Sequence, residues 1–159
     1  MYKRQGPDVV KTVTNEEVTA DELGGADVHT TKSSVSDGAY DNDIDMLSDI
    51  RRFIDFLPSS NTQSAPIRET FDKVSRSETS LDYLIPENSN TPYDIKEFII
   101  KAIDEGDFFE IQSNFAKNIV VGFGRIDGYT VGFVGNQPMN LAGVSVSYTH
   151  LTLPTKRIV

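Results

Sequence analysis

The chain has 159 residues, a formal net charge of −9 and 38% hydrophobic residues, enough for the core of one domain. With no cysteine, disulfides, thiolate catalysis and cysteine-ligated metal sites are excluded, and two histidines, His29 and His150, are too few for a histidine-rich metal centre. The acidic balance argues against nucleic acid as a partner, and the lack of a membrane-spanning or signal-peptide pattern predicts a cytoplasmic location.

The first forty residues are predicted to form a strand over 7–12, a short helix of two turns, and a loop or bent strand over 27–40. Thr14 and Thr19 each begin the T-x-x-E spacing of a capping box. Gly24 and Gly25 follow and predict a left-handed end to the helix.

An amphipathic helix is predicted over 42–57, with Asp41 or Asn42 as its cap and Pro58 after its end. Its apolar side chains recur at spacings of three and four residues, at Ile44, Leu47, Ile50, Ile54 and Leu57. The nearby carboxylates, at positions 41, 43, 45 and 49, are interpreted as a solvated helix face because they do not converge on one point.

Residues 58–92 contain four prolines and many Ser, Asn and Thr residues, which predicts an extended connection between two folded parts. A second helix is then predicted, with Thr91 as cap, Pro92 at its first position and Gly106 at its end. Its inward face is predicted to comprise Ile95, Phe98, Ile99, Ala102 and Ile103.

Three strands are predicted after this helix, over 108–112, 119–126 and 129–136. Asp127-Gly128 lies between the last two, and this dipeptide between β-rich runs is typical of a hairpin with a type I′ turn.

Several short motifs point to one known family. They are GP-x-VV from Gly6, LGGA-x-x-H from Leu23 to His29, LP-S-S-N after the first long helix, and G-R-I-D-G-Y in the hairpin. Together, from Gly6 to Val144, the sequence resembles the carboxyltransferase subunit of biotin-dependent acyl-CoA carboxylases, the family of the propionyl-CoA carboxylase β chain and the methylmalonyl-CoA decarboxylase α chain. Ser34 departs from the pattern, because the family usually has glycine there.

The resemblance implies an α/β, crotonase-like (ClpP/crotonase) carboxyltransferase fold, covering the end of one domain and the start of a second. Residues 6–57 would end the N-terminal domain, 58–90 would be the inter-domain linker, and 91–144 would open the C-terminal domain. Residues 1–5 and 145–159 are predicted to be translated sequencing adapter, because MYKRQ and VSYTHL back-translate to a transposon mosaic end.

The activity implied by the resemblance is transfer of a carboxyl group between carboxybiotin and an acyl-CoA such as propionyl-CoA or methylmalonyl-CoA. Backbone N–H groups of two glycine pairs would stabilise the enolate and the ureido oxygen. Both pairs fall outside 6–144, so no catalytic residue and no metal are expected in this fragment, which should be inactive alone. Gly6 and Pro7 are candidates for lining the acyl pocket, and His29 for the biotin or CoA entrance; the alternatives are scaffold roles and, for His29, a structural hydrogen bond.

The implied cofactor is biotin, carried on a partner protein. The implied partners are biotin carboxyl carrier and biotin carboxylase subunits, or membrane decarboxylase subunits, and the full-length chain is expected to form a hexamer. Residues 6–144 alone are expected to be molten or aggregated. The alternative function is a small acidic interaction domain without catalysis.

Overall fold

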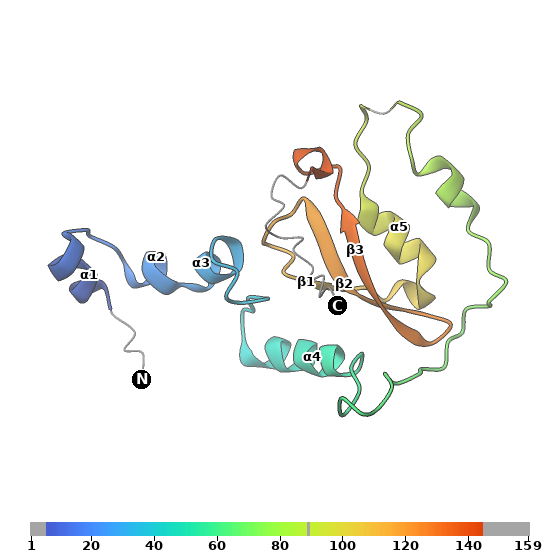
Figure 1. The fold of residues 1–159 in the computed structure, drawn as a ribbon, viewed down its shortest axis with the longest axis horizontal. Coiled ribbons are helices and arrows are strands. Elements are labelled where there is room, and N and C mark those ends of the chain that lie inside the picture. Colours follow the sequence, from blue (N-terminus) through green and yellow to red (C-terminus); the bar gives the residue numbers. More distant parts are fainter. Residues whose placement is uncertain (1–5, 89, 145–159) are drawn as a thin grey trace, which may run out of the picture. The chain divides into compact units, whose positions relative to one another are not determined.

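A computed structural model describes residues 6–88 and 90–144, so the predicted adapter segments lie outside the described residues. The chain divides into two compact units. Figure 1 labels their helices and strands. Within the described residues, the first comprises 6–66 with 110–116, and the second comprises 67–109 with 117–144. The predicted domain boundaries at 57/58 and 90/91 stay a prediction. No helix of the described residues is both long and apolar enough to cross a membrane.

The segment predicted as a strand over 7–12 is instead helix α1 (Pro7–Thr14). Pro7 occupies the first turn, where its missing N–H costs nothing and its fixed φ suits a helix. Two threonine hydroxyls donate to carbonyls four residues earlier, Thr12 to Asp8 and Thr14 to Val10. Such bonds do not stabilise a helix by themselves. Pro7 and Asp8 in the first turn are the residues that favour its start. Because Thr14 lies inside α1, the capping box predicted from it is wrong.

Helix α2 (Ala20–Gly24) begins with the capping box predicted from Thr19. The Glu22 amide donates to the Thr19 hydroxyl at 3.2 Å, and the Thr19 amide donates to the Glu22 carboxylate at 2.9 Å. The helix ends at the predicted place, but Gly25 has φ −69° rather than a left-handed conformation. Glycine suits this position because an added β-carbon would lie 2.6 Å from the carbonyl oxygen of Asp21.

Helix α3 (Ala26–Thr31) occupies the start of the segment predicted as a loop or bent strand over 27–40. Thr30 and Thr31 again donate to backbone carbonyls of the preceding turn, those of Ala26 and Asp27. The prediction of a loop or bent strand is therefore wrong for residues 27–31: hydroxyl side chains favour loops, but here they bond to the helix backbone.

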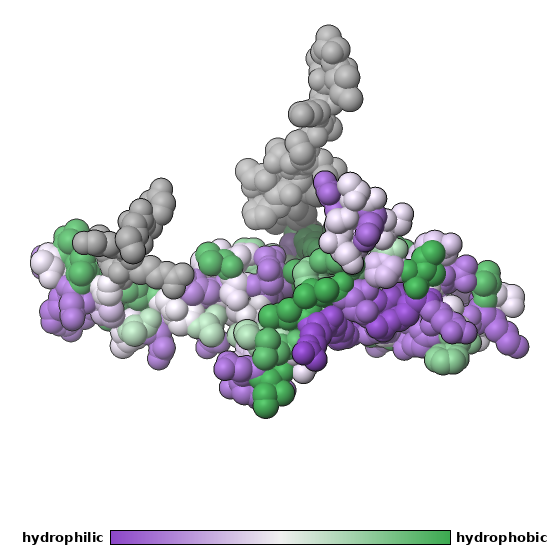
Figure 2. Space-filling view, turned by 90° about the horizontal axis from the view of Figure 1, so that it is seen from below, coloured by the Kyte–Doolittle hydropathy of each residue, from purple (hydrophilic) through white to green (hydrophobic). Residues whose placement is uncertain are grey.

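Helix α4 (Asp43–Ile54) confirms the predicted amphipathic helix, and Asn42 is its cap, accepting from the Asp45 amide at 2.9 Å. The helix ends at Ile54, three residues before the predicted end at 57. The predicted apolar stripe is present in the sequence but remains at the surface. Ile44 is 76% exposed and Ile54 is 59% exposed, while Phe56, just after the helix, is 1% exposed. Figure 2 shows hydrophobic residues at the surface among hydrophilic ones.

In the described part of 58–92 the regular structure is the short 3₁₀ helix η1 (Thr79–Tyr83). Helix α5 (Ile95–Ala102) follows, so the predicted start at Thr91-Pro92 and end at Gly106 are both corrected. Asp94 is the N-cap because its carboxylate accepts from the Lys96 amide at 2.9 Å. A separate 3₁₀ turn, η2 (Asp104–Gly106), comes after the helix.

The sheet has three strands in the order β1-β2-β3: β1 (Phe109–Ile111), β2 (Ile119–Ile126) and β3 (Tyr129–Asn136). Strands β2 and β3 pair antiparallel, from Ile119 opposite Asn136 to Ile126 opposite Tyr129. The turn residues have φ 51° at Asp127 and φ 77° at Gly128. Positive values at both positions confirm the predicted type I′ hairpin. A last 3₁₀ turn, η3, covers Leu141–Gly143.

The core of the second unit lies between α5 and the sheet. Ile99, Ile103 and Val120 are buried together, with Ile95, Phe108 and Phe133 packed around them. Burial stabilises by about 2 kcal/mol for each such side chain. The predicted inward face of α5 is confirmed for Ile99 and Ile103, but Phe98 is 41% exposed.

Candidate functional site

The first two predicted site residues, Gly6 and Pro7, begin a helix rather than a strand. Gly6 is the N-cap of α1, with φ −80°, and its carbonyl accepts from the amide of Val9 at 3.0 Å. Gly6 is exposed, and a β-carbon added there would meet no atom within 4 Å. Neither space nor backbone conformation therefore requires glycine here, and a role in the acyl pocket stays a prediction.

The third predicted residue, His29, lies on α3 and is half-buried. Its Nδ1 is 3.0 Å from the Ser33 hydroxyl, one turn later in the chain. Its Nε2 lies 3.4 Å from a β-carbon built on Gly24. This local hydrogen bond matches the structural role that the sequence left open, while a place at the biotin or CoA entrance stays a prediction.

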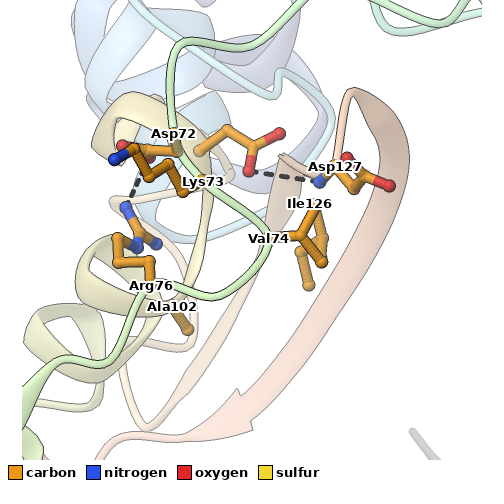
Figure 3. A pocket seen from close by; sticks show the side chains of 8 residues that line it. Asp72, Lys73, Val74, Arg76, Ala102, Ile126 and Asp127 are labelled. Atoms are coloured by element: carbon orange, nitrogen blue, oxygen red, sulfur yellow. Dashed lines mark hydrogen bonds and ion pairs between the residues drawn. The ribbon is translucent and has the colours of Figure 1, made fainter.

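The described residues bring together a different group of polar side chains, around a pocket of about 140 Å³ in the second unit (Figure 3). Three segments line it. The extended connection supplies Asp72, Lys73, Val74 and Arg76. The end of α5 and η2 supply Ala102 and Asp104, and the hairpin supplies Ile126 and Asp127.

Asp104 is the most deeply placed polar group of this pocket, at 6% exposed. Its carboxylate accepts two backbone hydrogen bonds from the hairpin turn, from the Gly128 amide at 2.7 Å and the Asp127 amide at 3.2 Å. A type I′ turn leaves these amides pointing away from the ladder, so a buried carboxylate is a suitable acceptor for both.

Glu105 of η2 and Asp72 of the extended connection each accept a hydrogen bond from the segment that contains the other. The Glu105 carboxylate accepts from the Phe71 amide and the Thr70 hydroxyl, both at 2.8 Å, and the Glu105 amide donates to the Asp72 carboxylate at 2.9 Å. Arg76 forms an ion pair with Asp72 and donates to the carbonyl of Ile103 at 2.9 Å. Figure 3 shows Asp72 and Arg76 together on this segment.

The acidic side chains around this pocket act as acceptors that hold backbone amides of neighbouring segments in place. The carboxylates of Asp72, Asp104 and Glu105 are engaged by donors of the chain itself, and no group of three or more acidic or histidine residues among the described positions could hold a metal ion. Among the described residues, Gly6 is open to solvent and His29 bonds to Ser33, so a role for either in binding biotin or acyl-CoA stays a prediction. No reaction step is therefore assigned to these side chains.

Sequence reasoning missed the anchoring residues, although one signal was present. Asp104 and Glu105 directly follow a helix, where carboxylates face the negative end of the helix dipole. Acidic residues at that unfavourable place indicate that donors lie nearby. The structure supplies the turn amides to Asp104, and the Phe71 amide and Thr70 hydroxyl to Glu105.

Comparison with known proteins decides the family. The model of the carboxyl transferase domain matches residues 4–150 of this chain. The chain belongs to the carboxyl transferase family. This confirms the resemblance drawn from the short motifs.

Relatives of this carboxyl transferase chain carry specific names. It is 64% identical over 138 residues to the propionyl-CoA carboxylase beta chain of Cereibacter sphaeroides, covering 87% of this chain and 27% of that one. It is 50% identical to the mitochondrial human protein of that name (87% and 26% covered), and 46% identical to the methylmalonyl-CoA decarboxylase subunit alpha of Veillonella parvula (87% and 27%). The chain thus spans about a quarter of the length of these relatives.

A solved structure supports the fold of this carboxyl transferase chain. The transcarboxylase 12S crystal structure with hydrolysed methylmalonyl-coenzyme A matches with a TM-score of 0.84 at 37% identity, covering 87% of this chain and 27% of that one. The predicted crotonase-like carboxyltransferase fold is confirmed.

Proposed function

We propose that this chain is part of a longer subunit that transfers a carboxyl group between carboxybiotin and an acyl-CoA, with propionyl-CoA and methylmalonyl-CoA as the substrate pair. The observation that carries the proposal is the 64% identity over 138 residues to a propionyl-CoA carboxylase beta chain. Such identity along the matched segment supports a shared reaction. The alternative, an acidic interaction domain without catalysis, has no comparable support.

In the proposed reaction a carbon–carbon bond forms at the acyl α carbon as the nitrogen–carbon bond of carboxybiotin breaks. The α proton of the acyl group ends on the biotin ureido nitrogen. Biotin would be carried on a partner protein, and the glycine pairs that stabilise the developing oxyanions would come from outside 6–144. Residues 6–144 would therefore supply scaffold and part of the substrate pocket.

The partners follow from the same proposal. We propose a biotin carboxylase and a biotin carboxyl carrier as partners of a carboxylase, or membrane subunits as partners of a decarboxylase. The names of the relatives, a beta chain and a subunit alpha, support only that such chains work with other subunits. The chain is 64% identical to the carboxylase chain of Cereibacter sphaeroides and 46% identical to the decarboxylase chain of Veillonella parvula, which favours the partners of a carboxylase. A hexamer is proposed from the transcarboxylase 12S neighbour, which is described as a hexamer assembly. A cytoplasmic location stays a prediction, because mitochondrial chains are among the relatives.

The test runs the reaction backwards. The full-length subunit is given methylmalonyl-CoA with and without free biotin, and propionyl-CoA is measured. Biotin-dependent formation of propionyl-CoA is the expected result, and decarboxylation that ignores biotin, or none at all, would overturn the proposal.

A variant of the same protein tests the proposed acyl pocket. Gly6→Val is expected to lower turnover while oligomer size is unchanged, because the open surroundings of Gly6 accept a side chain. Val13→Ala, on the exposed face of α1, is the matched control. Unchanged turnover in Gly6→Val would assign Gly6 and Pro7 to the scaffold.

A further inference from the structure

The extended connection contains a segment that is attached to the second unit along its length. We call residues 67–76 the clasp. The Arg68 amide donates to the carbonyl of Gly128 at 3.0 Å, and the Phe71 amide donates to Glu105 at 2.8 Å. A flexible linker would leave these backbone groups to water, so the clasp is an ordered part of the second unit.

The attachment is reciprocal at Glu105. The Glu105 side chain holds the clasp at Phe71, and Asp72 of the clasp accepts a hydrogen bond from the Glu105 amide at 2.9 Å. Glu105 has φ 50°, a left-handed conformation that side chains with a β-carbon disfavour. A strained conformation of this kind persists where surrounding contacts impose it, and the clasp provides those contacts.

Asp104, the residue before Glu105, extends this hydrogen-bond network to the hairpin. Its carboxylate holds the amides of Asp127 and Gly128. The backbone angles of η2 therefore determine where this carboxylate lies. The path runs from Asp72 through η2 to the turn, and the bond from the Arg68 amide to the Gly128 carbonyl closes it into a ring.

Steric fit at the turn strengthens this ring. A β-carbon added to Gly128 would lie 2.0 Å from the carbonyl oxygen of Arg68, so clasp and turn are in close contact. At the other end of the clasp, Arg76 donates to the carbonyls of Lys101 and Ile103 at 3.0 and 2.9 Å. The guanidinium thus compensates both Asp72 and the negative end of α5.

We propose that the clasp is a conformational device that couples the segment by which the chain enters the second unit to the turn between β2 and β3. Release of the clasp loosens the turn, and loosening of the turn releases the clasp. The coupling passes through Asp72, Glu105 and Asp104, so Asp72 influences Gly128 without contacting it. The proposal does not depend on the reaction that the protein catalyses.

Hydrogen exchange measured by mass spectrometry on the full-length subunit tests the coupling. Asp72→Ala removes the acceptor of the Glu105 amide and the ion-pair partner of Arg76. It is expected to speed exchange by roughly tenfold or more in the peptide containing Phe71 and also in the peptide containing Asp127 and Gly128. Asp72→Asn keeps an acceptor oxygen and is expected to restore most of the protection. Lys73→Ala is the matched control, since Lys73 lines the same pocket and its side chain is not a member of the ring.

The β2 peptide containing Val120, in the core of the second unit, is the internal reference, because unfolding of that unit would speed its exchange as well. Faster exchange at both the clasp and the turn, with the Val120 peptide unchanged, supports the coupling. Faster exchange at the clasp alone would show that the clasp is attached to the second unit without being coupled to the turn. Equal exchange in Asp72→Ala and Lys73→Ala would show that the ring of contacts does not form. Either outcome overturns the proposal.

Discussion

Among the glycines that the structure describes, Gly128 has the least room for an added β-carbon. Its φ of 77° and the 2.0 Å distance from an added β-carbon to the Arg68 carbonyl leave no room for a side chain. Replacing Asp127-Gly128 by Ala-Ala places residues with a β-carbon at two positive φ angles, at a cost of about 1 kcal/mol each before the clash is counted.

We therefore expect the Ala-Ala variant of the full-length subunit to lose stability and assembly, measured by thermal unfolding and by oligomer size. Asp127→Asn is the control, because asparagine is accepted in a type I′ turn and the variant keeps the backbone amides that Asp104 binds. Normal assembly of the Ala-Ala variant would show that the turn tolerates side chains.

Tyr40 has the largest pKa change that the structure defines. Its hydroxyl donates to the Asp49 carboxylate at 2.6 Å, and this hydrogen bond, with burial and the charges of Asp49 and Asp37, raises the pKa of Tyr40 to about 12. The folded pKa lies above the unfolded value of about 10, so the stabilising contribution is complete below pH 10 and is lost as pH rises from about 10 to about 12.

Phenolate absorbance, taken as the difference between wild type and Tyr40→Phe, measures this titration. Asp49→Asn should bring the midpoint back towards about 10, whereas Asp43→Asn, on the same helix, should leave it high. A wild-type midpoint at the ordinary tyrosine value would contradict the hydrogen bond.

Prediction of the candidate site from sequence reached only as far as the resemblance. Gly6, Pro7 and His29 were named because the family motifs contain them, and the structure places Gly6 at a helix cap and His29 against Ser33. The Asp104 anchor could not be predicted, because its donors are twenty-three and twenty-four residues away and meet it only after the hairpin folds.

At the scale of elements, prediction succeeded where the signal is local. The period of α4 and the Asp127-Gly128 turn each depend on neighbouring residues, and the bounds of β2 and β3 were predicted correctly. The prediction for α1 failed because β-branched valines and threonines favour a strand, whereas Pro7 and Asp8 in the first turn favour the start of a helix.

The start of α5 failed for a long-range reason. Thr91-Pro92 and Asp94 are both reasonable helix starts by local rules. Gln137, beyond the end of β3, decides between them, since its side-chain amide donates to Asp94 at 2.6 Å and its carbonyl accepts from the Ile95 amide at 3.3 Å. A helix-capping rule considers only neighbouring residues, so it does not include a partner more than forty residues away in the sequence.

At the scale of the whole molecule, the described residues bury few large apolar side chains. Phe56, Ile99, Ile103 and Val120 are the buried hydrophobic residues of this part of the chain, while Ile44 of α4 and Phe71 of the clasp, at 93% exposed, lie at the surface. A small buried core agrees with a segment spanning about a quarter of its relatives' length. That residues 6–144 alone are molten or aggregated stays a prediction.

The most direct test of the central claim is the forward reaction. The full-length subunit is mixed with carboxybiotin and propionyl-CoA, and methylmalonyl-CoA is measured, with residues 6–144 alone as the comparison. The account predicts transfer by the full-length subunit and none by residues 6–144. Failure of the assembled full-length subunit to form methylmalonyl-CoA, or transfer by residues 6–144 alone, would contradict it.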